Sequence, residues 1–167
     1  MNTIITNRLT LRPFKDEDWT RAVRILTDSQ VNQTYMIPDF PNDEAARPLF
    51  QRLKQLSEDE KRFVRAICLE DELIGFMNDV EVVGQRVEMG YVIATAHKGN
   101  GYATEALTAA IAALFQRGFE TVRCGAFEEN PASCRVMAKS GMHLIEETEV
   151  IAYRGKDHRC IYYEINK

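Results

Sequence analysis

The sequence contains no hydrophobic run that approaches the ~20 consecutive apolar residues of a membrane-spanning helix. Its first six residues lack the basic start and the apolar centre of a secretory leader. It also lacks blocks of like charge, because its 21 basic residues are scattered among 25 acidic ones. These absences predict a cytoplasmic protein whose partner is neither a membrane nor a nucleic acid.

Cysteine and histidine are scarce, with four and three among 167 residues. The cysteines are widely spaced and form no C-x-x-C pair, and the histidines lack the spacing of metal ligands. These residues are Cys68, Cys124, Cys134, Cys160, His97, His143 and His158. We therefore expect reduced thiols, no disulfide framework and no metal site.

The length and the apolar content are those of one domain with a core of its own. No internal repeat and no low-complexity segment divides the sequence. We therefore predict a single domain over residues 1–167.

Hydrophobic periodicity predicts both strands and helices. Runs with strand character, bounded by turn residues, predict seven strands, over residues 8–12, 63–69, 73–83, 86–93, 121–127, 143–153 and 158–165. Helical spacing predicts four helices, over residues 17–26, 43–56, 102–117 and 131–140. The order of these elements predicts an α+β fold whose mixed sheet has one parallel stretch around the third helix.

The most informative segment joins the strand predicted over residues 86–93 to the alanine-rich helix that follows. Its sequence is Lys98-Gly99-Asn100-Gly101-Tyr102-Ala103-Thr104-Glu105-Ala106. Glycines let backbone N–H groups face outward, and the first turn of a helix leaves several N–H donors unpaired at the positive end of the macrodipole. The segment therefore predicts an anion site that fits a pyrophosphate.

Three kinds of phosphate site compete for this segment. A Walker loop is excluded because the sequence has no G-x-x-x-x-G-K-S/T. A dinucleotide site needs a third glycine where this chain has Thr104, and it needs a βαβ unit where antiparallel strands are predicted. The remaining pattern is Q/R-x-x-G-x-G/A, here with Lys98 in first position, and by it the chain resembles the GNAT acyl-CoA-dependent N-acyltransferases.

Further segments make the chain similar to the RimJ/RimL-like branch of that family. They are Thr6-Asn7-Arg8-Leu9-Thr10-Leu11-Arg12, Glu88-Met89-Gly90-Tyr91, Gly101-Tyr102-Ala103-Thr104-Glu105-Ala106 and Asn130-Pro131-Ala132-Ser133. Two positions depart from the family: Lys98 replaces the usual Arg or Gln, and Met142 follows Gly141 where Phe is usual. Neither change removes a backbone donor, and Lys98 keeps the positive charge without the planar fork of arginine.

The resemblance implies a mostly antiparallel sheet of about seven strands, with helices on both faces and the fourth and fifth strands splayed apart. It implies acetyl-CoA as cosubstrate, with pantetheine held along the fourth strand like an added strand, and no metal. The residues expected to bind acetyl-CoA are Tyr91, Val92, Ile93, Lys98, Gly99, Asn100, Gly101, Tyr102, Ala103, Thr104, Asn130 and Ser133.

Transfer to an amine needs a base, because amines are mostly protonated at neutral pH. By resemblance Glu88 is the candidate, acting directly or through water, and also contacting the acceptor; the alternative is a strand glutamate that faces solvent or pairs with Arg86 or another cation. Ser133 is expected to donate a hydrogen bond to the sulfur or pantetheine. Asn130 binds pantetheine or caps a helix. A covalent role for Cys134 is disfavoured, because no histidine lies beside it in the sequence.

The acceptor is not encoded in a recognisable motif. Tyr35 and Phe40 are candidates to line its pocket, with packing against the core as the alternative. We expect a primary amine, with a protein N-terminus as the leading acceptor and small amines as the alternative. Two other readings stay open: an acyl-CoA-binding module without catalysis, and a site for a different anion. A monomer and a homodimer are both compatible with the sequence.

Overall fold

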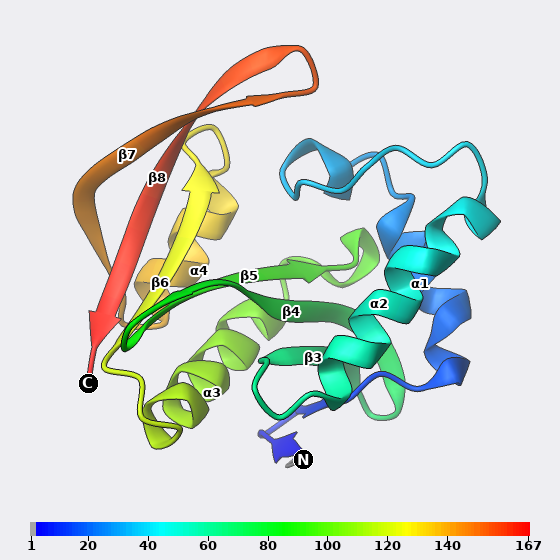
Figure 1. Ribbon diagram of the computed structural model, residues 1–167, viewed down its shortest axis with the longest axis horizontal. Coiled ribbons are helices and arrows are strands. Elements are labelled where there is room, and N and C mark those ends of the chain that lie inside the picture. Colours follow the sequence, from blue (N-terminus) through cyan, green and yellow to red (C-terminus); the bar gives the residue numbers. More distant parts are fainter. Residues whose placement is uncertain (1–2) are drawn as a thin grey trace. The chain divides into compact units, whose positions relative to one another are not determined.

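The computed structural model describes residues 3–167 and contains an eight-stranded sheet with four α-helices (Figure 1). The strands are β1 (Ile4–Ile5), β2 (Leu9–Arg12), β3 (Val64–Leu69), β4 (Glu72–Val83), β5 (Arg86–Ile93), β6 (Thr121–Phe127), β7 (His143–Tyr153) and β8 (Lys156–Asn166). The helices are α1 (Trp19–Leu26), α2 (Arg47–Glu58), α3 (Tyr102–Gln116) and α4 (Pro131–Lys139). The strand order is β1-β2-β3-β4-β5-β6-β8-β7.

The chain forms two compact units. The first contains residues 3–78 and 91–106, and the second contains residues 79–90 and 107–167. Strands β4 and β5 and helix α3 each contribute residues to both units.

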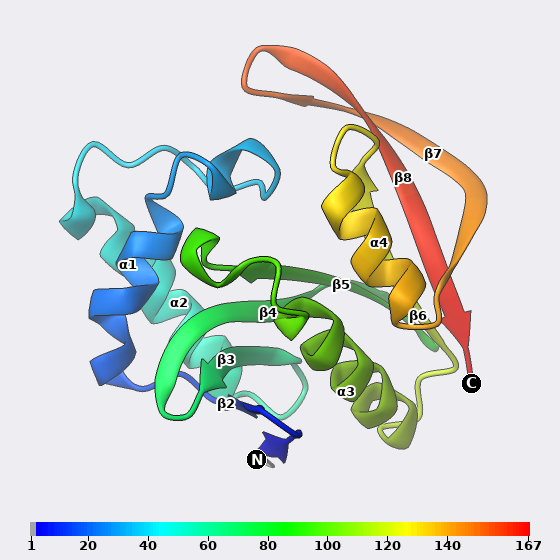
Figure 2. The same cartoon turned by 180° about the vertical axis from the view of Figure 1, so that it is seen from behind.

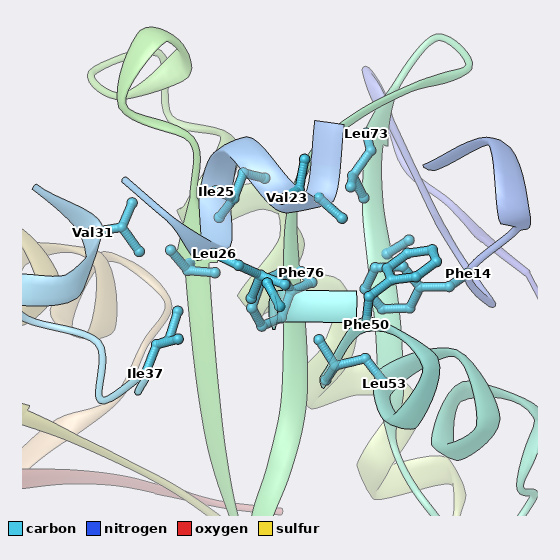
Figure 3. Packing of buried hydrophobic residues seen from close by; sticks show 14 of the residues in the cluster. Phe14, Val23, Ile25, Leu26, Val31, Ile37, Phe50, Leu53, Leu73 and Phe76 are labelled. Atoms are coloured by element: carbon cyan, nitrogen blue, oxygen red, sulfur yellow. The ribbon is translucent and has the colours of Figure 1, made fainter. Parts of the chain in front are cut away.

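The first unit packs α1 and α2 against an antiparallel run of strands. The pairings β1 with β2, β2 with β3, and β3 with β4 are all antiparallel. Phe14 lies edge-on to Phe50 at 5.9 Å and tilted against Phe76 at 6.1 Å. Figure 3 shows these rings together with the aliphatic side chains of the same buried cluster, Leu26 among them. These buried aromatic contacts stabilise the unit that carries the glycine loop.

The second unit contains the parallel stretch. Strand β5 pairs in parallel with β6 from Arg86 opposite Thr121 to Met89 opposite Cys124. Strand β8 pairs antiparallel with both β6 and β7, and β7 and β8 form a long hairpin (Figure 1). Helix α4 lies against β6 and β7 (Figure 2).

The structure confirms the predicted α+β class, the mixed, mostly antiparallel sheet and its parallel stretch. The sheet has eight strands instead of the expected seven, because Ile4–Ile5 adds a strand next to β2. Two residues are too few to show an alternating pattern, so periodicity could not predict this strand. The splaying of β5 from β6 and the single domain of residues 1–167 stay predictions.

Among residues 3–167, no helix combines the length and the apolar character that crossing a bilayer requires. Met1 and Asn2, part of the segment in which no leader is expected, lie outside the described residues.

Candidate active site

The glycine segment forms a tight loop between β5 and α3. A short 3-10 turn, Thr95–His97, follows β5, and Gly99 and Gly101 then both adopt a φ of +79°. This left-handed region is accessible to glycine without steric cost. The side-chain amide of Asn100 donates to the carbonyls of His97, at 3.1 Å, and Lys98, at 3.2 Å. The loop therefore has a defined shape that its two glycines make possible.

Helix α3 begins directly after this loop. The amide of Glu105 donates to the carbonyl of Gly101 at 3.0 Å, which is the first turn's closing hydrogen bond. Amides that come before this bond in the chain have no intrahelical acceptor, and the macrodipole adds positive potential at the same end. The arrangement suits an anion that accepts several N–H donors at once.

The cofactor-binding residues predicted in this region all belong to the first unit. Lys98, Gly99, Asn100 and Gly101 are exposed, Tyr102, Ala103, Thr104 and Tyr91 are half-buried, and Val92 and Ile93 are buried. The turn before the loop is tied to the segment just after α1, because the Thr95 hydroxyl donates to Asp28 at 2.7 Å. The exposed residues Lys98 to Gly101 therefore follow a turn that a side-chain hydrogen bond holds in place.

The second unit contains the other residues predicted for catalysis and cofactor binding: Glu88, Asn130 and Ser133. Glu88 on β5 lies opposite Arg123 on β6 in the parallel ladder. The Arg123 side chain is only 3% exposed, and its Nε lies 3.6 Å from Glu88 Oε2. That distance exceeds a hydrogen bond, and among the described residues this Nε has no hydrogen-bond partner. Arg123 therefore acts on Glu88 mainly through its charge.

Arg123 is shared among several groups. Its Nη2 lies 2.8 Å from Glu147, its Nη1 lies 3.7 Å from Glu164, and its guanidinium lies 3.8 Å above the ring of Tyr162. A buried guanidinium needs such compensation, because taking its charge out of water is costly. Because Arg123 lies closer to Glu147 than to Glu88, part of its positive charge is already compensated, and it stabilises the Glu88 carboxylate less.

Burial raises the pKa of Glu88, and the positive charge of Arg123 works in the opposite direction. The Glu88 side chain is 20% exposed, so it is still reached by solvent or a ligand. Of the alternatives for this residue, pairing with a cation other than Arg86 is what the structure shows, because Arg123 lies 3.6 Å from Glu88 while Arg86 lies 3.8 Å from Glu81. A half-buried carboxylate with a raised pKa is chemically suited to accept a proton.

Asn130 caps α4, as one of its two readings predicted. Its side-chain oxygen accepts a hydrogen bond from the amide of Ser133 at 3.3 Å. This contact fixes the start of the helix and holds the half-buried Ser133 in its first turn. Burial raises the pKa of the neighbouring Cys134 thiol, which favours the unreactive protonated form.

The loop that leads to Asn130 is held by His158, which sequence reasoning missed. The His158 ring stacks on Phe127 at 4.3 Å and contacts Glu129 through Nδ1. The amide of Asn130 donates to the Phe127 carbonyl at 2.8 Å. Glu129 and Asn130 are adjacent, so this cluster positions the cap of α4.

The two aromatic residues expected near the acceptor pack against the core of the first unit. The Tyr35 ring lies edge-on to Phe76 at 5.6 Å, and its hydroxyl donates to the side chain of Asn78. Phe40 is also half-buried. Their predicted contact with an acceptor stays a prediction. Among residues 3–167, no group of three or more His, Cys, Asp or Glu side chains is arranged to hold a metal ion.

Comparisons with known proteins agree with this geometry. The family model described as acetyltransferase (GNAT) domain matches residues 8–143. A relative from Bacillus licheniformis, named as the uncharacterized N-acetyltransferase p20, is 30% identical over 146 residues, which cover 82% of this chain and 80% of the relative. The chain belongs to the GNAT acetyltransferase family and is an N-acetyltransferase of that type.

Solved structures share the fold over nearly the whole chain. A GNAT-family acetyltransferase from Bacillus anthracis has a TM-score of 0.85 at 24% identity, with 99% of this chain and 98% of that chain covered. RimL, a ribosomal L7/L12 α-N-protein acetyltransferase solved with coenzyme A, has a TM-score of 0.84 at 18% identity, covering the same shares. The family model and the relative confirm the resemblance to GNAT acetyltransferases found in the sequence, and these structures share its fold.

The first prediction concerns the electrostatic coupling between Arg123 and Glu88. Replacing Arg123 by methionine removes the charge that lowers the pKa of Glu88, so we expect this already raised pKa to move further upward. Carboxyl chemical shifts followed by NMR titration measure the change. The control is Arg86→Met. Arg86 also lowers the pKa of Glu88, but less than Arg123 does, so its removal should raise this pKa by a smaller amount. Equal pKa values for Glu88 in the wild type and Arg123→Met would contradict the coupling.

Proposed function

We propose that this chain transfers an acetyl group from acetyl-CoA to a primary amine, by direct attack within a ternary complex. The observation that carries this proposal is the glycine loop at the start of α3, with its two left-handed glycines and a helix N-terminus whose first closing hydrogen bond runs from the Glu105 amide to the Gly101 carbonyl. The RimJ/RimL-like branch, a cytoplasmic location and a monomeric or homodimeric state are parts of the same proposal.

The loop fits the pyrophosphate of acetyl-CoA. A Cβ atom at Gly99 would meet no atom within 4 Å, so the space beside this backbone is open to a ligand. Amides from Gly99 to Thr104 supply the donors, because the Lys98 amide already donates to the Thr95 carbonyl at 3.3 Å. The exposed Lys98 side chain adds a positive charge. The backbone of Tyr91, Val92 and Ile93 is assigned to pantetheine, as an added strand.

The reaction forms a bond between the acceptor nitrogen and the thioester carbonyl carbon and breaks the bond from that carbon to sulfur. Glu88 takes the proton that the amine loses, directly or through a water molecule. The departing thiolate of CoA is a tolerable leaving group, since a thiol has a pKa of about 8.5. Ser133 donates a hydrogen bond to the sulfur, and Asn130 holds pantetheine.

The leading acceptor is a protein N-terminal α-amino group. Support comes from the likeness to RimL, whose name describes an α-N-protein acetyltransferase. Small amines are the alternative, because Tyr35 and Phe40 pack against the core and do not define a pocket of known specificity.

Turnover tests this proposal directly. Purified protein, acetyl-CoA and a panel of N-terminal peptides, polyamines, amino acids and aminoglycosides are assayed for release of free CoA. We expect turnover with at least one amine, fastest with an N-terminal peptide, and no burst of CoA before the acceptor is added. A burst without acceptor would contradict direct attack, and CoA binding without turnover on any amine would favour a non-catalytic module.

The proposed base generates a pH-dependent prediction. Glu88→Gln should lower kcat/KM by about 100-fold near pH 6.5, because most of an α-amine with a pKa of about 8 is still protonated there. The loss should shrink as the pH approaches 9, where the amine deprotonates by itself. The pH–rate profile measures this, with Glu72→Gln as a control at an exposed ion pair with Arg21. An unchanged profile in Glu88→Gln would remove Glu88 as the base.

A further inference from the structure

One feature of the first unit has no role in the mechanism above: the segment before β2 grips the first turn of α3. The carboxylate of Glu105 accepts hydrogen bonds from the Thr6 hydroxyl at 2.6 Å, the Arg8 amide at 2.7 Å and the Arg8 Nε at 2.7 Å. These partners lie more than 95 residues apart in the sequence. Three short hydrogen bonds to one carboxylate hold it rigidly.

Arg8 also contacts the glycine loop itself. Its Nη1 donates to the carbonyl of Asn100 at 2.9 Å, and its guanidinium lies 4.6 Å from the centre of the Tyr102 ring. A Cβ atom at Gly101 would lie 3.4 Å from Nη2. One guanidinium therefore lies against three consecutive residues of the loop while its Nε holds Glu105.

The charge of Glu105 makes this contact important for an anionic ligand. Burial opposes its ionisation, but the hydrogen bonds from Thr6 and Arg8 outweigh burial and lower the pKa of Glu105. The carboxylate is therefore ionised at neutral pH, in the same helical turn whose amides face the proposed pyrophosphate. An acidic group suits an empty helix N-terminus, but it repels a second anion bound there.

We infer that Arg8 is a positioning residue for acetyl-CoA, which fixes the glycine loop through Asn100 and cancels the charge of Glu105 beside the pyrophosphate. This inference rests on the proposed function, because it assumes that acetyl-CoA binds at this loop. It gives the segment around Thr6 and Arg8 a role in binding, although this segment is remote in sequence from the glycine loop.

A double-mutant cycle separates the two parts of this role. Arg8→Ala should weaken CoA binding by about tenfold or more, because it frees the loop and leaves the negative charge of Glu105 without its cation. Glu105→Gln should weaken binding less, because it removes the repelling charge together with the ion pair. The double variant Arg8→Ala/Glu105→Gln should bind CoA more tightly than Arg8→Ala alone. Calorimetry with CoA measures all four proteins, and thermal melts verify that each is folded.

Kinetics distinguish positioning from a general loss of structure. In Arg8→Ala the KM for acetyl-CoA should rise while kcat at saturating acetyl-CoA stays within about twofold of the wild type. Arg8→Lys keeps the charge without the fork and should be intermediate. The control is Arg21→Ala, since Arg21 is also 40% exposed and paired with one glutamate, and this variant should bind CoA like the wild type.

Each outcome is decisive. If wild-type protein binds CoA and folded Arg8→Ala binds it equally well, the inference is overturned while the proposed function stands. A double variant that binds no better than Arg8→Ala overturns the charge-cancelling role. If Arg8→Ala does not fold, Arg8→Lys and Glu105→Gln carry the comparison, and unchanged CoA affinity in both overturns the inference. Wild-type protein that fails to bind CoA removes the proposed function itself.

Discussion

The N-terminus of α3, whose first N–H groups have no acceptor within the helix, is the constraint on which the proposed chemistry depends. A helix cannot satisfy its first N–H groups internally, and here the preceding loop turns through two glycines with positive φ, so that Gly99 and Gly101 place no Cβ atom over the backbone. In the proposed function these N–H groups donate to an anion beside Gly99. The loop follows the end of strand β5, and the contact between Thr95 and Asp28 holds the turn that precedes it. An anionic cosubstrate is the natural partner of such backbone.

A second constraint acts in the other unit. The parallel register of β5 and β6 sets Arg123 opposite Glu88, and a shift of one residue would turn Arg123 to the opposite face. Arg123 is buried and forms a close ion pair with Glu147. Its charge lowers the pKa of Glu88, although it forms no hydrogen bond to this carboxylate. The pKa of Glu88, the proposed base, therefore depends mainly on desolvation, which raises it, and secondly on the charge of Arg123, which lowers it.

Local features of this fold were readable in the sequence, and long-range ones were not. The glycine loop and the cap at Asn130 are local patterns, and both took the expected form. The partner of Glu88 was not predicted, because Arg123 becomes its neighbour only through strand register. The grip of Arg8 on Glu105 spans 97 positions and is invisible to periodicity, although both residues lie in segments that carry the family resemblance.

The central claim is that the pyrophosphate of acetyl-CoA is held by the backbone of the glycine loop. Amide hydrogen exchange of the wild-type protein tests it most directly, measured alone, with saturating CoA and with pantetheine, which lacks the pyrophosphate. CoA should slow exchange at residues 99–104, and pantetheine should leave these amides unchanged. Saturation with CoA that leaves exchange at residues 99–104 unaltered would contradict it.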